Sequence, residues 1–190
     1  MDNNLKTIRA TEQLGQNKKM VIYVYTGEGA GKTTNAIGLA VRTAGQKRYA
    51  VIIQFLKWYP TGEYKIQNRL KPYYRIYQFG RKGWHGKKNL KEKDKELCEG
   101  AFEFAKNLLK KKNLDLLVLD EINLAMAWGM LETEKVVKYL KEVKLNRKNL
   151  DVVLTGRYAP KNIIEIADVV NEIKSVKEPK EMITKKGINY

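Results

Sequence analysis

The amino-acid sequence predicts an α/β fold, in which helices cover both faces of a mainly parallel central sheet of about six strands. Two observations support this prediction. Short apolar runs, rich in β-branched and aromatic residues, alternate with longer segments whose apolar residues recur every three or four positions. A glycine-rich stretch joins the first apolar run to the first helical segment, and an acidic pair ends a later apolar run. We therefore expect the strands to be buried between two layers of helices.

The first half of the chain supplies three expected strands and one helix. The run MVIYVYT predicts a buried strand at 20–26, directly before the glycine-rich stretch. Residues 32–45 predict a helix, because small apolar residues recur at helical spacing and Gly45 can end it. The runs YAVIIQFL and YYRIYQF predict strands at 49–56 and 73–79.

The second half continues the alternation. Residues 91–112 predict an amphipathic helix, which ends in three lysines that suit the negative end of a helix dipole. The segment ETEKVVKYLKEV predicts another helix, with acidic residues in its first turn, and Pro160 suits the first turn of a third. The elements expected here are helices at 91–112, 132–143 and 160–167 and strands at 114–119, 150–155 and 168–174.

We expect one domain at 20–190, preceded by a mobile segment at 1–19. The chain of 190 residues is long enough for a sizeable core, and we find no repeat or low-complexity linker in it. Residues 80–89 form the one long irregular stretch inside the domain, and such loops are often functional. No apolar run is long enough to span a bilayer or to form a signal peptide, so we expect a cytoplasmic protein without a membrane partner.

Cysteine and histidine each occur once, as Cys98 and His85. These counts exclude a disulfide framework and a Cys/His zinc site within one chain, and they leave little room for histidine-based nucleophilic catalysis. Cys98 lies beside Leu97 in an expected helix, so we interpret it as a core residue and not as a nucleophile.

The formal net charge of +16 suggests an anionic partner, and nucleic acid is the obvious candidate. Most of the excess charge is lysine that is spread along the whole chain. Because scattered lysines are typical of solvated faces, we favour that interpretation and expect no nucleic-acid partner.

The stretch GEGAGKTT at 27–34 resembles a phosphate-binding loop that is one residue too short. The usual spacing places the first glycine at position 26, which is Thr26 in this chain. A strand, a glycine-rich turn and a helix N-terminus nevertheless direct backbone N–H groups at one anion. Lys32 adds a positive charge, and the Thr33 hydroxyl can bind Mg²⁺. A dinucleotide-binding pattern would need glycine in place of Lys32 and is excluded.

Two further motifs follow later expected strands. The run LLVLDE places Asp120 and Glu121 at the carboxyl edge of the sheet, where the Mg²⁺ of a bound nucleotide is held. The run TGR places Arg157 at the same edge, where a guanidinium can clamp phosphate with two donors. Together these motifs predict a three-layer P-loop nucleotide-binding fold, of the RecA-like type, without specifying the reaction.

The chain also resembles a known family, the P-loop type of corrinoid adenosyltransferase that acts on cob(I)alamin or cob(I)yrinic acid a,c-diamide (the CobA/CobO/BtuR family). The resemblance runs from about Met20 to Tyr190. The stretches that carry it are GEGAGKTTNAIGLAVRTAG, IIQFLKW, Gly62-Glu63, FGRKGW, LVLDEIN, VVLTGRYAP and the tail from VVNEIKSVKEP to KGINY. The short loop is itself a feature of this family.

The resemblance implies that ATP donates its 5′-deoxyadenosyl group to the Co(I) of a reduced corrinoid, and that triphosphate leaves. The nucleotide would lie in the loop in the opposite sense to that in a kinase, which explains why the loop can be short. Co(I) is a strong nucleophile that needs no general base, so the single histidine is no obstacle. The resemblance also implies a homodimer, with an N-terminal segment that can fold over the active site.

The resemblance further implies the site residues. Lys32 would contact phosphate, Thr33 and Glu121 would hold Mg²⁺ with Asp120 beside them, and Lys32, Thr33 and Glu121 would carry the catalysis. Trp84 would be the aromatic side chain that faces the corrinoid, with Phe79 and His85 nearby. The expected ATP-binding set is Gly27, Glu28, Gly29, Ala30, Gly31, Lys32, Thr33, Thr34, Arg42 near the nucleoside end, and Arg157.

The sequence departs from the family pattern at two places. Many members have lysine at the position of Ala30 and a small polar residue at that of Glu28, and many carry a Gly-Phe-x-Trp arrangement where this chain has only Trp84. Two other functions stay open: a P-loop ATPase or kinase that releases ADP, and an ATP-dependent nucleic-acid-binding protein. The basic surface would also suit an acidic flavoprotein that supplies the reducing electron.

Overall fold

The computed structural model describes residues 19–83, 86–111, 114–179, 181 and 184–188. Six strands form one parallel sheet in the order β3-β2-β4-β5-β1-β6. The strands are β1 (Ile22–Thr26), β2 (Ala50–Phe55), β3 (Tyr74–Phe79), β4 (Leu116–Asp120), β5 (Asp151–Thr155) and β6 (Val169–Glu172). The helices are α2 (Lys32–Gly45), α3 (Gly62–Leu70), α4 (Glu92–Lys111), α5 (Ile122–Ala127), α6 (Thr133–Asn146) and α7 (Lys161–Ile166), with a 3₁₀ turn, η2, at Lys87–Asn89.

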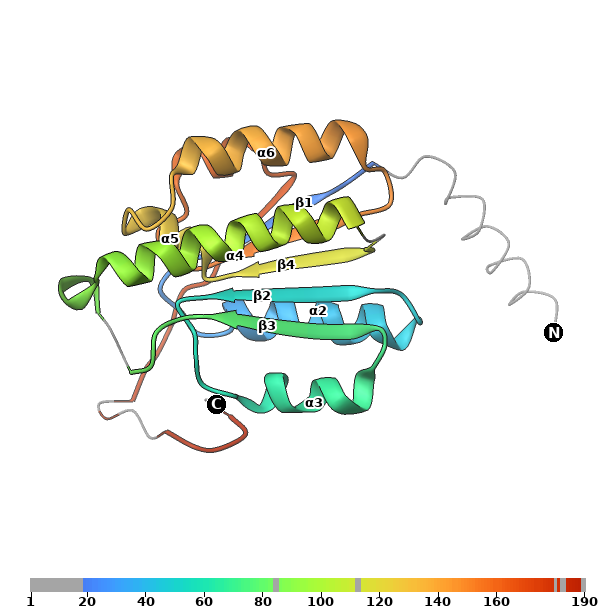
Figure 1. Ribbon diagram of the computed structural model, residues 1–190. Coiled ribbons are helices and arrows are strands. Elements are labelled where there is room, and N and C mark those ends of the chain that lie inside the picture. The colour runs from blue at the N-terminus through green and yellow to red at the C-terminus, as the bar shows by residue number, and fades with distance from the viewer. Residues whose placement is uncertain (1–18, 84–85, 112–113, 180, 182–183, 189–190) are drawn as a thin grey trace.

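Helices cover both faces of the sheet (Figure 1), as the alternation of strands and helices predicted. Helices α4, α5, α6 and α7 pack on one face, where Ile22, Val24 and Ile53 point into the larger core cluster. Helices α2 and α3 cover the other face, where alternate strand residues such as Tyr25 and Ile52 point. Strands that are buried on both faces read as continuous apolar runs, which is why these runs were recognisable in the sequence.

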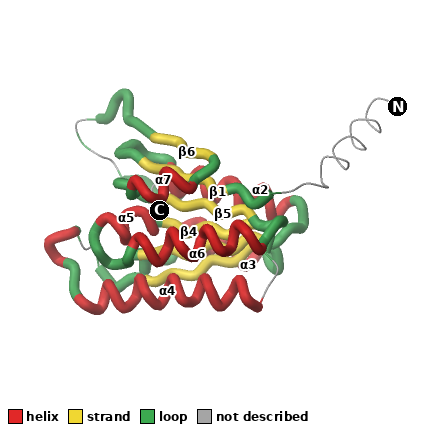
Figure 2. The backbone as a smooth tube through the Cα atoms, turned by 90° about the horizontal axis from the view of Figure 1, so that it is seen from above, coloured by secondary structure: helices red, strands yellow, loops and turns green. Residues whose placement is uncertain are grey.

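Strand β5 lies between β1, which leads into the glycine-rich loop, and β4, which ends in Asp120. Figure 2 shows this order from above the sheet. Because all pairings are parallel, the carboxyl ends of β1, β4 and β5 meet at one edge. Ligands bind at this edge in open α/β sheets.

The expected elements are all present, with bounds that differ by a few residues at their ends. Helices α3 and α5 were not predicted. Helix α3 has no fully buried residue and packs on the core through the partly buried Tyr64 and Leu70, so its apolar pattern is weak. Helix α5 is only six residues long. The expected last strand at 168–174 is shorter: β6 comprises Val169–Glu172, which stand in register with Tyr23–Thr26 of β1.

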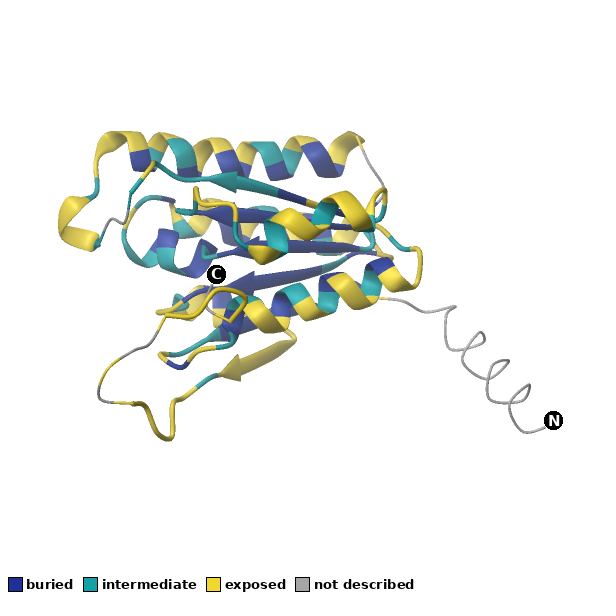
Figure 3. Ribbon diagram, turned by 90° about the horizontal axis from the view of Figure 1, so that it is seen from below, coloured by how far each residue is buried: buried dark blue, intermediate teal, exposed yellow. Residues whose placement is uncertain are grey.

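Strand β6 is an edge strand, and all four of its residues are exposed. Figure 3 shows this strand as exposed beside the buried central strands. The residues that follow it, from Ile173 onward, leave the sheet and return past the glycine-rich loop. The single cysteine, Cys98, is buried in α4, and burial raises the pKa of its thiol to about 12, so it is a core residue as predicted. No helix in the described part of the chain is long and apolar enough to cross a membrane.

Candidate active site

The glycine-rich loop turns sharply between β1 and α2. Gly27 and Gly31 both have the positive φ angles, +95° and +109°, that residues with a side chain rarely adopt. Gly31 is the N-cap of α2, and no side chain among the described residues caps that helix. The N–H groups of the first turn therefore remain available to an anion, which the helix dipole also attracts.

The loop packs directly against the segment that follows β6. The Gly29 N–H donates a hydrogen bond of 2.8 Å to the Ile173 carbonyl, and the Ile173 N–H donates one of 2.8 Å to the Thr26 carbonyl. A Cβ atom on Gly27 would lie 2.4 Å from the Ile173 oxygen, and one on Gly29 would lie 2.8 Å from the Lys174 carbonyl carbon. Gly27 and Gly29 therefore both lie against the backbone of residues 173–175.

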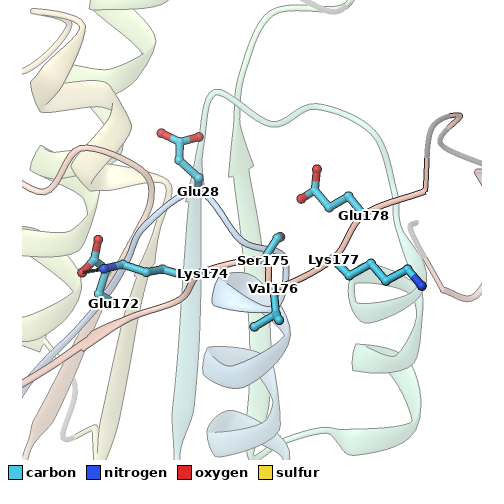
Figure 4. Close-up of a pocket in the computed structure, with 7 residues that line it drawn as sticks. All are labelled: Glu28, Glu172, Lys174, Ser175, Val176, Lys177 and Glu178. Carbon is cyan, nitrogen blue, oxygen red and sulfur yellow. Dashed lines mark ion pairs between the residues drawn. The ribbon is translucent and has the colours of Figure 1, made fainter.

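A pocket of about 600 Å³ lies between the loop and this C-terminal segment. Figure 4 shows Glu28 on the loop, with its carboxylate pointing away from Val176, and the ion pair between Lys174 and Glu172. The Lys174 Nζ atom lies 3.0 Å from Glu172 Oε2. The side chains that line the pocket come from Glu28 and from Glu172, Lys174, Ser175, Val176, Lys177 and Glu178.

Lys32 is buried at the start of α2, and its ammonium donates a hydrogen bond of 2.5 Å to the Gly29 carbonyl. Burial lowers the pKa of Lys32, and the positive charge of Arg157 lowers it further. Arg157 is itself paired with the exposed carboxylate of Glu28, at 3.0 Å from Nε to Oε2. Lys32, Arg157 and Glu28 thus form one charged group around the loop.

Asp120 is fully buried at the end of β4, and side chains from four places in the chain donate to its carboxylate. Thr33 and Thr155 donate to Oδ1 at 2.8 and 2.6 Å. Gln54 and Lys57 donate to Oδ2 at 2.9 and 2.7 Å. Burial alone would raise the pKa of Asp120, but the Lys57 ammonium and these hydrogen bonds hold it below its usual value. The carboxylate therefore stays ionised.

Glu121 has a left-handed backbone conformation, with φ of +64°, at the N-cap of α5. Its N–H donates a hydrogen bond of 3.0 Å to the Thr155 hydroxyl. Burial and the neighbouring charge of Asp120 raise the pKa of the Glu121 carboxyl. A non-glycine residue with positive φ costs free energy, and such residues cluster at functional sites because the surrounding structure fixes them there.

The donors at this edge fit a Mg²⁺ ion. The Thr33 hydroxyl donates a hydrogen bond to Asp120 and accepts one from Lys57, which leaves one oxygen lone pair for a metal ion. The charges of Asp120 and Lys57 both act on the Glu121 carboxyl and shift its pKa in opposite directions. Mg²⁺ prefers oxygen ligands, usually one or two from the protein and the rest from phosphate and water. Among the described residues, no group of three or more His, Cys, Asp and Glu side chains could form a complete metal cage. The Thr33 and Glu121 oxygens could therefore supply one or two ligands of such an ion.

The other predicted residues lie at differing distances from this centre. Thr34 and Ala30 are exposed at the loop. Arg42 is in the last turn of α2, ten residues beyond Lys32, and the helical rise separates the two by about 15 Å. Phe79 ends β3, and its ring packs 5.5 Å from that of Phe104 at the border of the core. Trp84 and His85 lie outside the described residues.

The structure adds residues that sequence reasoning did not select. Lys57, Gln54 and Thr155 all contact Asp120. Each lies at or just beyond the carboxyl end of an expected strand, which is the signal that identified Asp120. Lys57 stands within the quoted stretch IIQFLKW, and Thr155 begins the TGR motif, but neither was assigned a role.

Known proteins resemble this chain in fold and in sequence. A solved structure of a KaiC-like protein from Pyrococcus horikoshii superposes with a TM-score of 0.52 over 80% of this chain and 70% of that one; at 18% identity, this supports the fold alone. The corrinoid adenosyltransferase of Escherichia coli K12 is 34% identical over 85% of this chain and 80% of its own. Corrinoid adenosyltransferase CobA of Salmonella typhimurium is 32% identical over the same shares.

The family model described as ATP:corrinoid adenosyltransferase BtuR/CobO/CobP matches residues 18–190. This match spans every described strand and helix, including the glycine-rich loop, the acidic end of β4 and the segment after β6. The chain therefore belongs to the ATP:corrinoid adenosyltransferase family.

Proposed function

We propose that this protein transfers the 5′-deoxyadenosyl group of ATP to the Co(I) of a reduced corrinoid and releases triphosphate. The observation that carries the proposal is the family match over residues 18–190, which includes the shortened loop at 27–34. A loop that holds the whole triphosphate as a leaving group does not need to present the terminal phosphate to a second substrate, as a kinase loop does. The alternatives, an ATPase or kinase and a nucleic-acid-binding protein, have no comparable support.

The triphosphate would lie against the N-terminus of α2. Lys32 is buried beside the loop, so it would contact phosphate in a site of low dielectric. The attraction between its positive charge and the phosphate is stronger there than at the surface. The free N–H groups of the first turn of α2 would add hydrogen bonds, with Thr34 at the rim. Such preorganised donors stabilise the charge that develops on the leaving group.

Thr33 and Glu121 would hold Mg²⁺ directly, with Asp120 orienting Thr33 and Thr155 orienting Glu121. When bound, the ion would neutralise charge on the departing triphosphate. The hydrogen bond from Thr33 to Asp120 fixes the direction of the Thr33 lone pairs. The bond from the Glu121 N–H to Thr155 fixes the backbone of Glu121. Asp120 is saturated by its donors, so it acts as a positioning residue.

No general base is needed, because the attacking cobalt carries its electron pair and the attacked carbon is saturated. Catalysis then consists of alignment of the C5′ atom with the cobalt, together with stabilisation of the leaving group. We assign the corrinoid side to the loop at 80–89, with Trp84 as the aromatic that faces the ring. Phe79 supports that loop from the core, because its ring packs on Phe104.

Two partners complete the proposal. The net charge of +16 favours an acidic flavoprotein as the reductant that delivers the electron to cobalt. A homodimer, in which the N-terminal segment of one subunit covers the site of the other, would explain how water is kept from the cobalt. The lysines are spread along the whole sequence, which is typical of solvated faces, so we propose no nucleic-acid partner.

The proposal is tested by identifying both products of one reaction. The protein is incubated without oxygen with Mg²⁺, ATP and chemically reduced cob(I)alamin. A light-sensitive cobalt–carbon product together with triphosphate supports the proposal. ADP and phosphate with an unchanged corrinoid would contradict it. Lys32→Met should abolish the reaction, whereas Lys141→Met, on the exposed side of α6, should not.

A further inference from the structure

The Lys57 ammonium bridges Asp120 and Thr33, and Thr33 is one of the two proposed Mg²⁺ ligands. Its Nζ atom lies 2.7 Å from Asp120 Oδ2 and 3.1 Å from Thr33 Oγ1. The Thr33 hydroxyl in turn donates to Asp120 Oδ1 at 2.8 Å, so the three groups form a closed ring of hydrogen bonds. A positively charged group thus occupies one oxygen lone pair of Thr33, which is proposed to bind Mg²⁺.

The Lys57 ammonium balances a buried negative charge in the folded protein. Asp120 is fully buried, and an ionised carboxylate with no positive partner is strongly disfavoured in the interior. Lys57 is the positively charged side chain paired with it, at one end of a flexible four-carbon stem. The Lys57 side chain is 28% exposed, so it borders both the buried carboxylate and the open side of the site.

The backbone of Lys57 is held in place at the end of β2. Leu56 has a left-handed conformation, with φ of +58°, which turns the chain at the end of β2. A Cβ atom on Gly80 would lie 2.5 Å from the Lys57 N atom, so the two backbones touch. The next residue, Trp58, donates from its ring nitrogen to the Gly83 carbonyl at 2.9 Å. The backbone of Lys57 is therefore anchored to the loop at 80–83.

We propose that Lys57 is a built-in substitute for the metal: its ammonium balances Asp120 while no nucleotide is bound, and it moves to the triphosphate when Mg²⁺ enters with ATP. This inference rests on the proposed function for its nucleotide, but the exchange of cations is a separate event. Mg²⁺ alone must displace Lys57 without gaining any phosphate ligand. Mg²⁺ alone therefore binds weakly to the free enzyme and enters together with the nucleotide. The displaced Lys57 ammonium then adds a positive charge beside the leaving group.

The test measures binding of Mg²⁺ alone to the full-length protein, by thermal unfolding and by calorimetric titration. Lys57→Met removes the competing cation, and Lys141→Met on α6 removes an exposed lysine as the matched control. We expect the Kd for Mg²⁺ without nucleotide to fall at least about tenfold in Lys57→Met, which corresponds to about 1.4 kcal/mol of lost competition. Millimolar Mg²⁺ should then stabilise Lys57→Met, but neither the wild type nor Lys141→Met.

A second variant keeps the test decisive if Lys57→Met fails to fold. Lys57→Gln retains a hydrogen-bond donor for Asp120 without the charge, and the same fall in Kd is expected. If every Lys57 variant that folds binds Mg²⁺ as weakly as the wild type does, the inference is wrong and Lys57 is only a structural partner of Asp120. Because no corrinoid is present, a failure of adenosyl transfer in the wild type would overturn the proposed function and leave this result unaffected.

Discussion

Thr33, the second residue of α2, donates a hydrogen bond of 2.8 Å to Asp120 at the end of β4, although β5 lies between β4 and the strand that leads into α2. Thr155, the last residue of β5, donates to the same oxygen at 2.6 Å and fills the gap between them. The phosphate loop and the acidic strand end are therefore joined by side chains across an intervening strand, which makes Thr155 a structural part of the site.

The Thr155 hydroxyl should matter more than its methyl group. Thr155→Val leaves the Glu121 N–H and one Asp120 oxygen without this partner in a buried site, and it should destabilise the protein by about 1–3 kcal/mol. Thr155→Ser keeps the hydroxyl and should cost less than the valine variant. Urea unfolding of both variants measures the difference, and equal stabilities would show that the hydroxyl does not link the two strands.

Replacement by alanine should have opposite effects at Gly29 in the loop and at Gly38 in the following helix. Gly29→Ala places a Cβ atom 2.8 Å from the backbone of Lys174, so the C-terminal segment must move away from the loop and nucleotide binding should weaken. Gly38→Ala lies inside α2 with nothing within 4 Å, and alanine there should stabilise the protein by about 0.5–1 kcal/mol. Thermal unfolding and ATP titration of both variants test this pair; a harmless Gly29→Ala would mean that the contact with Lys174 is absent in solution.

Glu28 should oppose triphosphate binding. Its carboxylate is exposed in the phosphate loop and pairs with Arg157 at 3.0 Å, so a bound triphosphate must both replace this partner and tolerate a nearby negative charge. Glu28→Gln should therefore tighten the binding of Mg-ATP about two- to fivefold, which is the size expected for an exposed ion pair. The effect should shrink as salt is added, because exposed charges are screened. Weaker binding by Glu28→Gln would instead show that this carboxylate contacts the nucleotide favourably.

Stability should depend on pH through Asp168, at a distance from the active site. Partial burial opposes ionisation, but hydrogen bonds from Lys144 and the Ile22 N–H hold the pKa of Asp168 below its usual value. Because the native-state pKa is lowered, the stabilisation is complete above the unfolded-state pKa of about 3.9 and is lost as pH falls through the native value.

Asp168→Asn should therefore cost about 1 kcal/mol or less at pH 7, since both side chains of the pair are partly exposed. The difference from the wild type should disappear in acid. Urea midpoints of the two proteins, measured from neutral pH down to about pH 3, give this comparison. A difference that stays constant over that range would exclude ionisation of Asp168 as its cause.

The sequence alone predicted the architecture because buried parallel strands read as apolar runs and because amphipathic helices keep their spacing. It also predicted that Asp120 would lie beside the phosphate loop, since the ends of parallel strands share an edge, and the hydrogen bond from Thr33 to Asp120 agrees with this. It could not predict strand order, so the position of Thr155 between them was not foreseen. Lys57 was missed for a related reason: its partner, Asp120, is 63 residues away in sequence, and a lysine after a strand resembles the chain's many solvated lysines.

The central claim is that the bond broken in ATP is the one between C5′ and its oxygen. ATP that carries ¹⁸O in the bridge between C5′ and the α-phosphorus distinguishes the alternatives in one experiment with reduced corrinoid and the full-length protein. If the adenosyl group is transferred as proposed, all of the label leaves in triphosphate and none stays with the nucleoside. Label recovered in ADP or AMP would show cleavage at phosphorus and would contradict the account.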